Sequence, residues 1–240
     1  MRVRASTEVQ RCATEAFALG ALGGVLAGTV GALVGGGVVA APAAVVGAAN
    51  GVISGWRGVY DWRSVKGAGA FALDSTWALG TTLSAVVAHG VGALRGDPGY
   101  SESLSLRSNR HVYARGMQIR PGFATTFGNV VNGAGDASHP RRAKLVTDHE
   151  DVHIWQARGF GPLYPMLYVG WMIGGGVGGA ALWAARRRDE PITKVIESCA
   201  YYLNPFEYWA YSRDDHWPPR GLVASLGPTR PCVRSFASFR

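Results

Sequence analysis

The sequence predicts a mainly α-helical membrane protein, in which a small β-meander precedes a helix that carries the motif H-E-x-x-H. Three observations support this fold class. Hydrophobic residues make up 48% of the 240 residues, charged residues make up only 17%, and long runs of Gly, Ala and Val carry no charge. Globular proteins contain about 25% charged residues. The composition therefore favours helices that pack through small side chains inside a lipid bilayer.

Residues 1–95 form the first predicted region, which is glycine-rich and transmembrane. No residue from Phe17 to Trp56 is charged, and this run is long enough for two membrane-spanning helices of about 20 residues each. Gly35-Gly36-Gly37 and Pro42 can form the turn between them. A signal peptide is the alternative interpretation of a basic start and an apolar run, but its apolar segment would be much shorter. We therefore predict a helical hairpin.

Glycines recur at every fourth residue in both halves of this run. Each helix thereby carries a bare face, on which another helix backbone can pack closely. The pattern predicts a glycine zipper, either within the chain or between copies of it in a homo-oligomer. The glycines are Gly20, Gly24 and Gly28 in the first half, and Gly47, Gly51 and Gly55 in the second.

A third apolar segment runs from Gly67 to Leu94 and contains Asp74 and His89. A charged side chain inside a membrane span usually marks a functional site. Asp74 lies near the start of the segment, where a carboxylate can reach water. We therefore expect Asp74 to be solvated at the membrane interface, and the functional interpretation is the alternative.

The charge balance is basic, with a net charge of +8 and a pI of about 9.8. Basic domains often bind nucleic acid, but here the basic residues flank apolar runs, as they do on the cytoplasmic side of membrane proteins. We expect membrane lipid as a partner, no nucleic acid, and a location in the bacterial cytoplasmic (inner) membrane. The flanking residues are Arg2, Arg4, Arg11, Arg57, Arg63, Lys66 and Arg186 to Arg188.

Residues 96–217 form the second predicted region, and 218–240 an irregular C-terminal tail. Between Asp97 and His139, short strand-like pieces alternate with Gly and Pro, which indicates a small β-meander. The breaks between the pieces are Arg115-Gly116, Pro121-Gly122 and Gly128-Asn129.

Helices are predicted for the rest of this region. The first has Ser138 as its candidate cap and Pro140 in its first turn, and it ends at Gly159 or at Gly161-Pro162. An apolar segment, Leu163–Ala185, comes next. A further helical stretch runs from Pro191 to about Leu203, and Asn204 can then cap a short helix that begins with Pro205.

The chemistry of the sequence is concentrated in "DHEDVHIWQ", at residues 148–156. His149 and His153 are four residues apart, so on a helix they share one face and can bind one zinc ion. Glu150 then lies beside the metal, where it can accept a proton from water and pass it to a leaving group. The alternative is a polar helix face with solvated histidines. The bulky Ile154 and Trp155 oppose it, because they indicate a partly buried helix.

A hydrolytic zinc site needs a third protein ligand and one open position. Glu207 is our first choice, because it lies among aromatic residues in "NPFEYWAY", where an unpaired carboxylate would be costly. As the alternative, Glu207 occupies the third helical position after Asn204, where a capping-box Glu reaches back to the cap. Glu197, on the preceding helix, is the second choice for the ligand.

These ligands constrain the topology. The apolar segment Leu163–Ala185 separates His153 from Glu207 and is long enough to cross a membrane. Three arrangements allow the ligands to meet: the segment is re-entrant or buried in protein, the helix from Pro191 returns, or the site lies at membrane depth. Basic residues occur on both sides of the segment, and we therefore expect a cytoplasmic-facing site.

Two motifs together resemble known proteins. "HEDVHIWQARGFGPLYP" and "NPFEYWAY" look like a group of uncharacterised bacterial membrane proteins with H-E-x-x-H-x-x-Q, a Gly-Pro-Leu turn and N-P-F-E-x-x-A. H-E-x-x-H followed by a helical Glu is also similar to the gluzincin clan of zinc metallopeptidases. The resemblance covers about residues 107–211. It implies zinc on His149, His153 and Glu207, with Glu150 as the general base.

The sequence departs from that pattern at Tyr211. Many membrane gluzincins carry an acidic residue one turn after the ligand Glu, where it orients a histidine. Asp214, Asp148 or Asp151 would have to take this role here.

The sequence thus predicts a membrane-bound zinc metallopeptidase with a peptide or protein substrate. The alternative is a non-catalytic glycine-zipper scaffold or partner-binding protein with a structural or vestigial metal site. A third interpretation is a metal-dependent hydrolase that acts on lipid or cell-envelope material. Candidates for stabilising an oxyanion or supporting the metal ligands are Tyr201, Tyr208, Tyr211, Arg213, Asp214 and His216.

Overall fold

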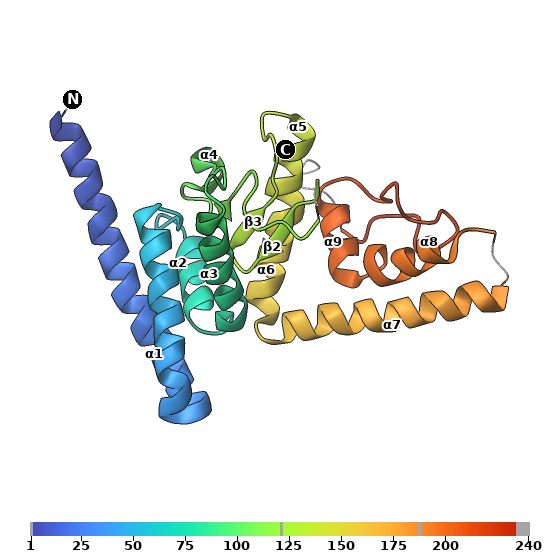
Figure 1. The fold of residues 1–240 in the computed structure, drawn as a ribbon, viewed down its shortest axis with the longest axis horizontal. Helices are drawn as coiled ribbons and strands as arrows, with labels where there is room; N and C mark the ends of the chain where they lie inside the picture. The colour runs from blue at the N-terminus through green and yellow to red at the C-terminus, as the bar shows by residue number, and fades with distance from the viewer. Residues whose placement is uncertain (1, 121, 187–188, 234–240) are drawn as a thin grey trace.

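The computed structural model describes residues 2–120, 122–186 and 189–233, with side chains from Ser6 onward, and it is mainly helical. Figure 1 shows three parts in a row. A long helical hairpin stands at one end beside two shorter helices. A small sheet and the helix with the H-E-x-x-H motif form the centre. At the other end, one long helix runs outward with the last helices alongside it.

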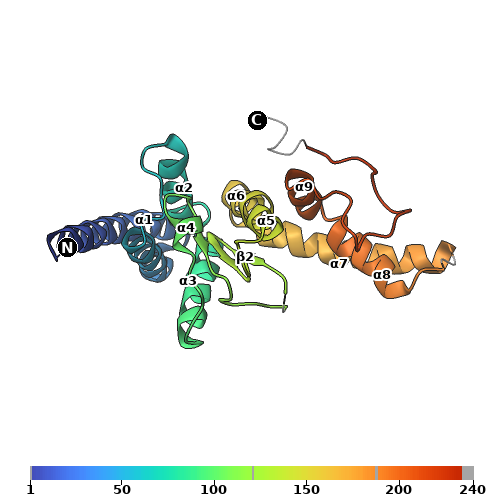
Figure 2. The same cartoon turned by 90° about the horizontal axis from the view of Figure 1, so that it is seen from above.

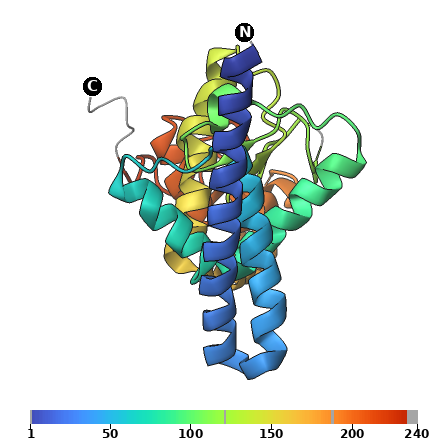
Figure 3. The same ribbon diagram turned by 90° about the vertical axis from the view of Figure 1, so that its left-hand side faces the viewer.

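The hairpin is formed by α1 (Arg2–Trp56), which consists of two antiparallel arms (Figure 3). The arms meet at Gly35 and Gly36, whose backbone is not helical, and Gly36 has a φ of 65° that favours glycine. The predicted turn is therefore confirmed at the glycines. Pro42 lies inside the second arm and not in the turn.

The zipper glycines hold the two arms of this hairpin together. A Cβ atom on Gly47 would overlap the carbonyl oxygen of Gly23, and one on Gly51 would overlap that of Leu19. Only glycine allows backbones to approach this closely. The zipper is thus used within the chain, and a homo-oligomer stays a prediction.

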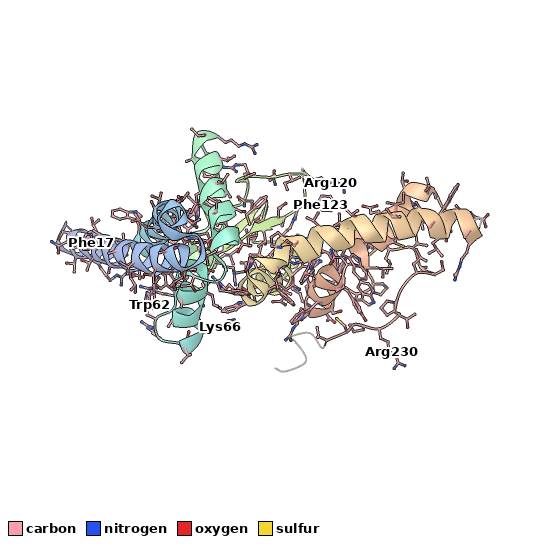
Figure 4. All side chains as sticks on the ribbon, turned by 90° about the horizontal axis from the view of Figure 1, so that it is seen from below. Phe17, Trp62, Lys66, Arg120, Phe123 and Arg230 are labelled. Carbon is pink, nitrogen blue, oxygen red and sulfur yellow. The ribbon has the colours of Figure 1, made fainter. Side chains whose placement is uncertain are left out.

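In the described part of the chain, two helices are long and apolar enough to cross a membrane: α1, from Ser6 onward, and α7 (Leu163–Arg186). Large apolar side chains point outward along both. In α1, Leu33, Val34 and Val38 are each at least 80% exposed, and Phe17 projects from the first arm (Figure 4).

The third apolar segment is broken into α2 (Val65–Ser75) and α3 (Leu79–Leu94), which are bent by 88°. The backbone leaves the helical conformation at Thr76. The indole Nε1 of Trp77 donates to the carbonyl of Gly159 at 3.2 Å, which fixes the bend to the central helix.

The expectation that Asp74 is solvated is wrong. Its side chain is buried, with 2% exposure, and it accepts two hydrogen bonds of 2.8 Å from the guanidinium of Arg158. The hydroxyl of Tyr60 donates to the same carboxylate at 2.8 Å. The bend after Asp74 turns the carboxylate inward, and its partner lies 84 positions later in the sequence, so no local pattern could reveal the pair.

The sheet has three short strands, β1 (His111–Val112), β2 (Thr125–Phe127) and β3 (Val130–Asn132), in the order β1-β3-β2. Its connectivity differs from a meander, because β1 pairs with β3 in parallel and only β2 and β3 form an antiparallel hairpin. Gly128, with a φ of 54°, makes the hairpin turn at the predicted Gly128-Asn129 break. Pro121, in another predicted break, lies outside the described residues. Among the described residues, no strand pairs with the outer edge of β2.

The motif helix is continuous through α5 (Pro140–Lys144), a π-helical turn η1 (Leu145–Glu150) and α6 (Asp151–Phe160). Ser138 does not cap it, because its hydroxyl and its N–H both bond to Asp136. The helix ends before Gly161, whose positive φ stops it.

After α7 the chain turns back. The helices α8 (Ile192–Glu197) and η2 (Ser198–Tyr202) pack against α7, and α9 (Pro205–Arg213) then reaches the motif helix (Figures 1 and 2). Trp171 of α7 donates to the carbonyl of Cys199 at 3.2 Å. Of the three predicted arrangements, the return of the segment after Pro191 fits this path. Arg187 and Arg188 lie outside the described residues.

Asn204 caps α9 as predicted, since its side-chain oxygen accepts from the N–H of Phe206 at 3.1 Å. The tail from Pro218 to Val233 contains neither helix nor strand, as expected, and residues 234–240 lie outside the described part.

Replacing Gly51 with Ala should destabilise the hairpin by about 1–3 kcal/mol, because the methyl group would collide with the Leu19 carbonyl and push the arms apart. Gly37→Ala is the matched control, since a Cβ there meets no atom within 4 Å. Thermal unfolding in detergent measures both variants. Equal melting temperatures would contradict the close packing at Gly51.

Candidate metal centre

Three buried side chains from two helical segments meet at one point. His149 comes from η1, His153 follows one turn later in α6, and Glu207 comes from α9. The Nε2 atoms of the two histidines are 3.3 Å apart. The Glu207 carboxylate lies 3.5 Å from Nε2 of His149 and 3.3 Å from Nε2 of His153. This buried group could hold a metal ion.

The donor atoms fit a cation better than they fit one another. The Nε2 atoms face each other, so two protonated rings would direct N–H groups at each other across 3.3 Å. The Oε2 atom of Glu207 is buried and has no hydrogen-bond partner among the described residues. A buried carboxylate oxygen without a partner is costly, and a cation shared with the two rings would satisfy it.

The electrostatics of the site also favour a cation. Burial opposes protonation of His149, but the carboxylates of Asp214 and Glu207 outweigh it and raise the pKa of His149 to about 10. Burial likewise opposes ionisation of Glu207, yet the charge of His153 and the close approach of both rings hold the Glu207 pKa below its ordinary value. Carboxylates that stabilise positive charge on an imidazole stabilise a metal cation in the same way.

Each histidine is oriented through its other ring nitrogen. Nδ1 of His153 lies 2.9 Å from Oε1 of Gln156, whose amide donates to the carbonyl of Phe206 at 3.0 Å. Nδ1 of His149 lies 3.6 Å from the buried carboxylate of Asp214, which is beyond hydrogen-bond distance, so this contact is electrostatic. Polar groups behind the rings would keep each Nε2 atom directed at a bound metal ion.

Asp214 therefore occupies the place that the sequence pattern left open at Tyr211. It is held there by Arg141, whose guanidinium donates to it at 2.9 Å. The other two candidates are engaged elsewhere: Asp151 pairs with Arg110 at 2.6 Å, and Asp148 accepts from Thr147.

Glu207 does not act as a capping-box residue. Its Oε1 atom accepts a 2.6 Å hydrogen bond from the hydroxyl of Tyr168, and its carboxylate points at the histidines. Tyr164, one turn earlier in α7, places its hydroxyl 3.3 Å from Nδ1 of His153. Sequence reasoning missed both tyrosines, although their spacing of four residues within an apolar segment marked one polar stripe on α7.

Glu150 lies beside the three candidate ligands and is 4% exposed. Its Oε2 atom accepts a 2.7 Å hydrogen bond from the hydroxyl of Thr126 in β2. The edge strand of the sheet thus holds the carboxylate that the motif predicts as a general base.

A pocket opens next to this centre, and His149 and Glu150 form part of its wall. Three of the predicted supporting residues also line it, namely Tyr201, Tyr211 and His216. The ring of Tyr211 packs against that of His149, with centroids 4.6 Å apart.

The remaining candidates lie elsewhere. The hydroxyl of Tyr208 donates to the carbonyl of Arg230 at 2.6 Å, and among the described residues neither Tyr208 nor Arg213 lines the pocket. Glu197 is partly exposed and lies 3.9 Å from Arg120, outside the group that could bind a metal.

Comparisons of the chain with protein-family models, with curated proteins and with solved structures give no match. The resemblance to gluzincins therefore stays a prediction, and the chemistry of the site has to carry any functional conclusion.

Replacing any one of His149, His153 and Glu207 with Ala should remove a bound metal ion, because each supplies one of the converging donor atoms. Elemental analysis of the purified protein measures the metal content per chain. Glu197→Ala is the control and should leave the content unchanged, since that carboxylate is exposed and outside the group that could bind a metal. This ligand set would be contradicted if the Glu197→Ala variant lost the metal and the Glu207→Ala variant kept it.

Asp214→Asn should weaken metal binding by about 10-fold to 100-fold, the usual cost of losing a carboxylate that orients a ligand histidine. Titration against a competing chelator measures the affinity. The neighbouring Asp215→Asn is the control: Asp215 is exposed, and its φ of 62° suits Asn. Equal affinities in the two variants would exclude an orienting role for Asp214.

Proposed function

We propose that the chain is a membrane-bound zinc metallopeptidase with Glu150 as its general base. The observation that carries this proposal is the convergence of His149, His153 and Glu207 next to a pocket whose wall contains His149 and Glu150. Two imidazoles and one carboxylate form a ligand set found in hydrolytic zinc enzymes, which keep a fourth position for water or substrate. A zinc ion held there would polarise the scissile carbonyl group and lower the pKa of water.

Glu150 accepts and returns the proton in this mechanism. Thr126 occupies its Oε2 atom, so we assign the proton-accepting role to Oε1. The carboxylate takes a proton from the attacking water and donates it to the leaving amine. The hydrogen bond from Thr126 keeps the carboxylate directed into the pocket during both steps.

Tyr211 supplies a hydrogen-bond donor for the developing oxyanion, and the hydroxyl of Tyr201 is hydrogen-bonded to that of Tyr211. Burial and the nearby charge of Glu207 raise the pKa of Tyr201 and of Tyr211, so both hydroxyl groups stay protonated at neutral pH. His216 lines the same pocket. A donor aimed at an oxyanion contributes most in a site from which water is excluded.

The substrate backbone pairs with the free edge of β2 in this proposal. In the described part of the chain, β3 is the one strand that pairs with β2, and the Thr126 contact places β2 against Glu150. An extended peptide that adds to this edge gains backbone hydrogen bonds and passes the general base.

The exposed apolar surfaces of α1 and α7 support a membrane location. We propose the bacterial cytoplasmic membrane, with lipid around the hairpin. The rival proposal, a scaffold with a structural metal site, gives no reason for a carboxylate at position 150. The absence of an acidic residue at position 211 favours that rival, and the carboxylate of Asp214 near His149 weighs against it.

Glu150→Gln should abolish peptide hydrolysis, with a loss of at least about 100-fold, while zinc content stays at the level of the unaltered protein. A fluorogenic peptide library measures turnover, and elemental analysis measures zinc in the same samples. Glu102→Gln, at an exposed position of the helix α4 (Glu102–Ser105), is the control and should keep full turnover. A zinc-loaded protein without turnover on any peptide would favour the scaffold.

A further inference from the structure

We infer that the pocket beside the metal centre takes an anionic group of the substrate, a carboxylate or a phosphate, and that Arg142 and Arg220 bind it. The inference rests on the proposed function, because it assigns the substrate class of that same site. Its basis is the unbalanced charge of the pocket wall.

Three arginines line the pocket, and Glu150 is the one carboxylate among its described lining residues. The charge of Arg141 is already balanced, since it pairs with the buried Asp214 at 2.9 Å behind the wall. Glu150 has its own role and is satisfied by Thr126. The positive charges of Arg142 and Arg220 are therefore not balanced by a carboxylate of the pocket wall.

Neither of these two arginines has a carboxylate partner in the described part of the chain. Arg142 is half-buried and donates one hydrogen bond, at 2.9 Å, to the carbonyl of Gly122. That contact uses one of its five N–H groups and holds the guanidinium in place. Arg220 is exposed and comes from the C-terminal tail, so two distant segments bring unpaired charge to one pocket.

The pocket lining also contains the aromatic side chains of Phe123 and Tyr202. In Figure 4, Phe123 lies at the loop that leads into β2. Guanidinium groups bind carboxylates and phosphates through paired N–H donors, and a neutral peptide segment would leave the two positive charges without a counter-charge. A C-terminal carboxylate and a phosphate ester offer this same chemistry from two sources.

The test is equilibrium binding to the full-length, detergent-purified protein by titration calorimetry, with zinc content measured in every sample. The probes are phenylacetate, phenyl phosphate and the uncharged benzyl alcohol. At least one anion should bind ten-fold or more tightly than benzyl alcohol. Whichever of phenylacetate and phenyl phosphate binds more tightly identifies the anionic group of the substrate as a carboxylate or a phosphate.

The variants separate the arginines from the metal. The double variant R142Q/R220Q should lose this preference by ten-fold or more without losing zinc. R220Q alone, which alters an exposed side chain, should lose several-fold. R63Q removes the same charge from an exposed position between α1 and α2 and should bind like the unaltered protein.

An anion preference that survives in R142Q/R220Q would overturn the inference, because it would then come from the metal alone. Equal binding of all three probes would also overturn it. A sample without zinc contradicts the proposed function instead, and arginine-dependent anion binding in that sample would still support the anion pocket.

Discussion

A buried ion pair between Arg158 and Asp74 joins the two halves of the molecule. Arg158 lies at the end of the motif helix and is 1% exposed, and its guanidinium holds the Asp74 carboxylate and the carbonyl of Asn109. It thereby connects α6 to α2 and to the segment that leads into β1. Removing either charge would leave the other buried without a partner, which is far more costly than losing an exposed pair. The position of the metal centre relative to the hairpin depends on this contact.

The metal centre is an arrangement of excess negative charge around two imidazoles. Glu207 approaches both rings directly, and Asp214 supports His149 from behind. Arg141 balances the charge of Asp214 on its far side. The negative charge that is not balanced therefore lies at Glu207, next to the two imidazole rings. A cation is the natural occupant of such a point. The adjoining pocket has the opposite sign, because two of its arginines are unpaired, and the site therefore separates the place for a cation from the place for an anion.

The long helix α7 has two functions in this architecture. Its outer surface is apolar and exposed, with Met166, Ile173 and Val177 each at least 65% exposed. Its inner surface contributes Tyr168, which donates to the candidate ligand Glu207. The chain then folds back along the glycines of α7, since Gly175 and Gly179 leave room for Cys199. One helix thus provides an apolar exterior and a hydrogen bond to the metal centre.

Local patterns in the sequence determined the glycine hairpin, its turn at Gly36, the motif helix and the Asn204 cap, because periodicity and punctuation act within a few residues. They also identified His149, Glu150 and His153, which share one helix. Only the tertiary structure brought Glu207 to the histidines, placed Asp214 in the orienting role and added Tyr164 and Tyr168. It alone decided that Asp74 is buried and that β1 lies parallel to β3. These contacts join residues far apart in the chain, and their geometry depends on how the helices bend and pack.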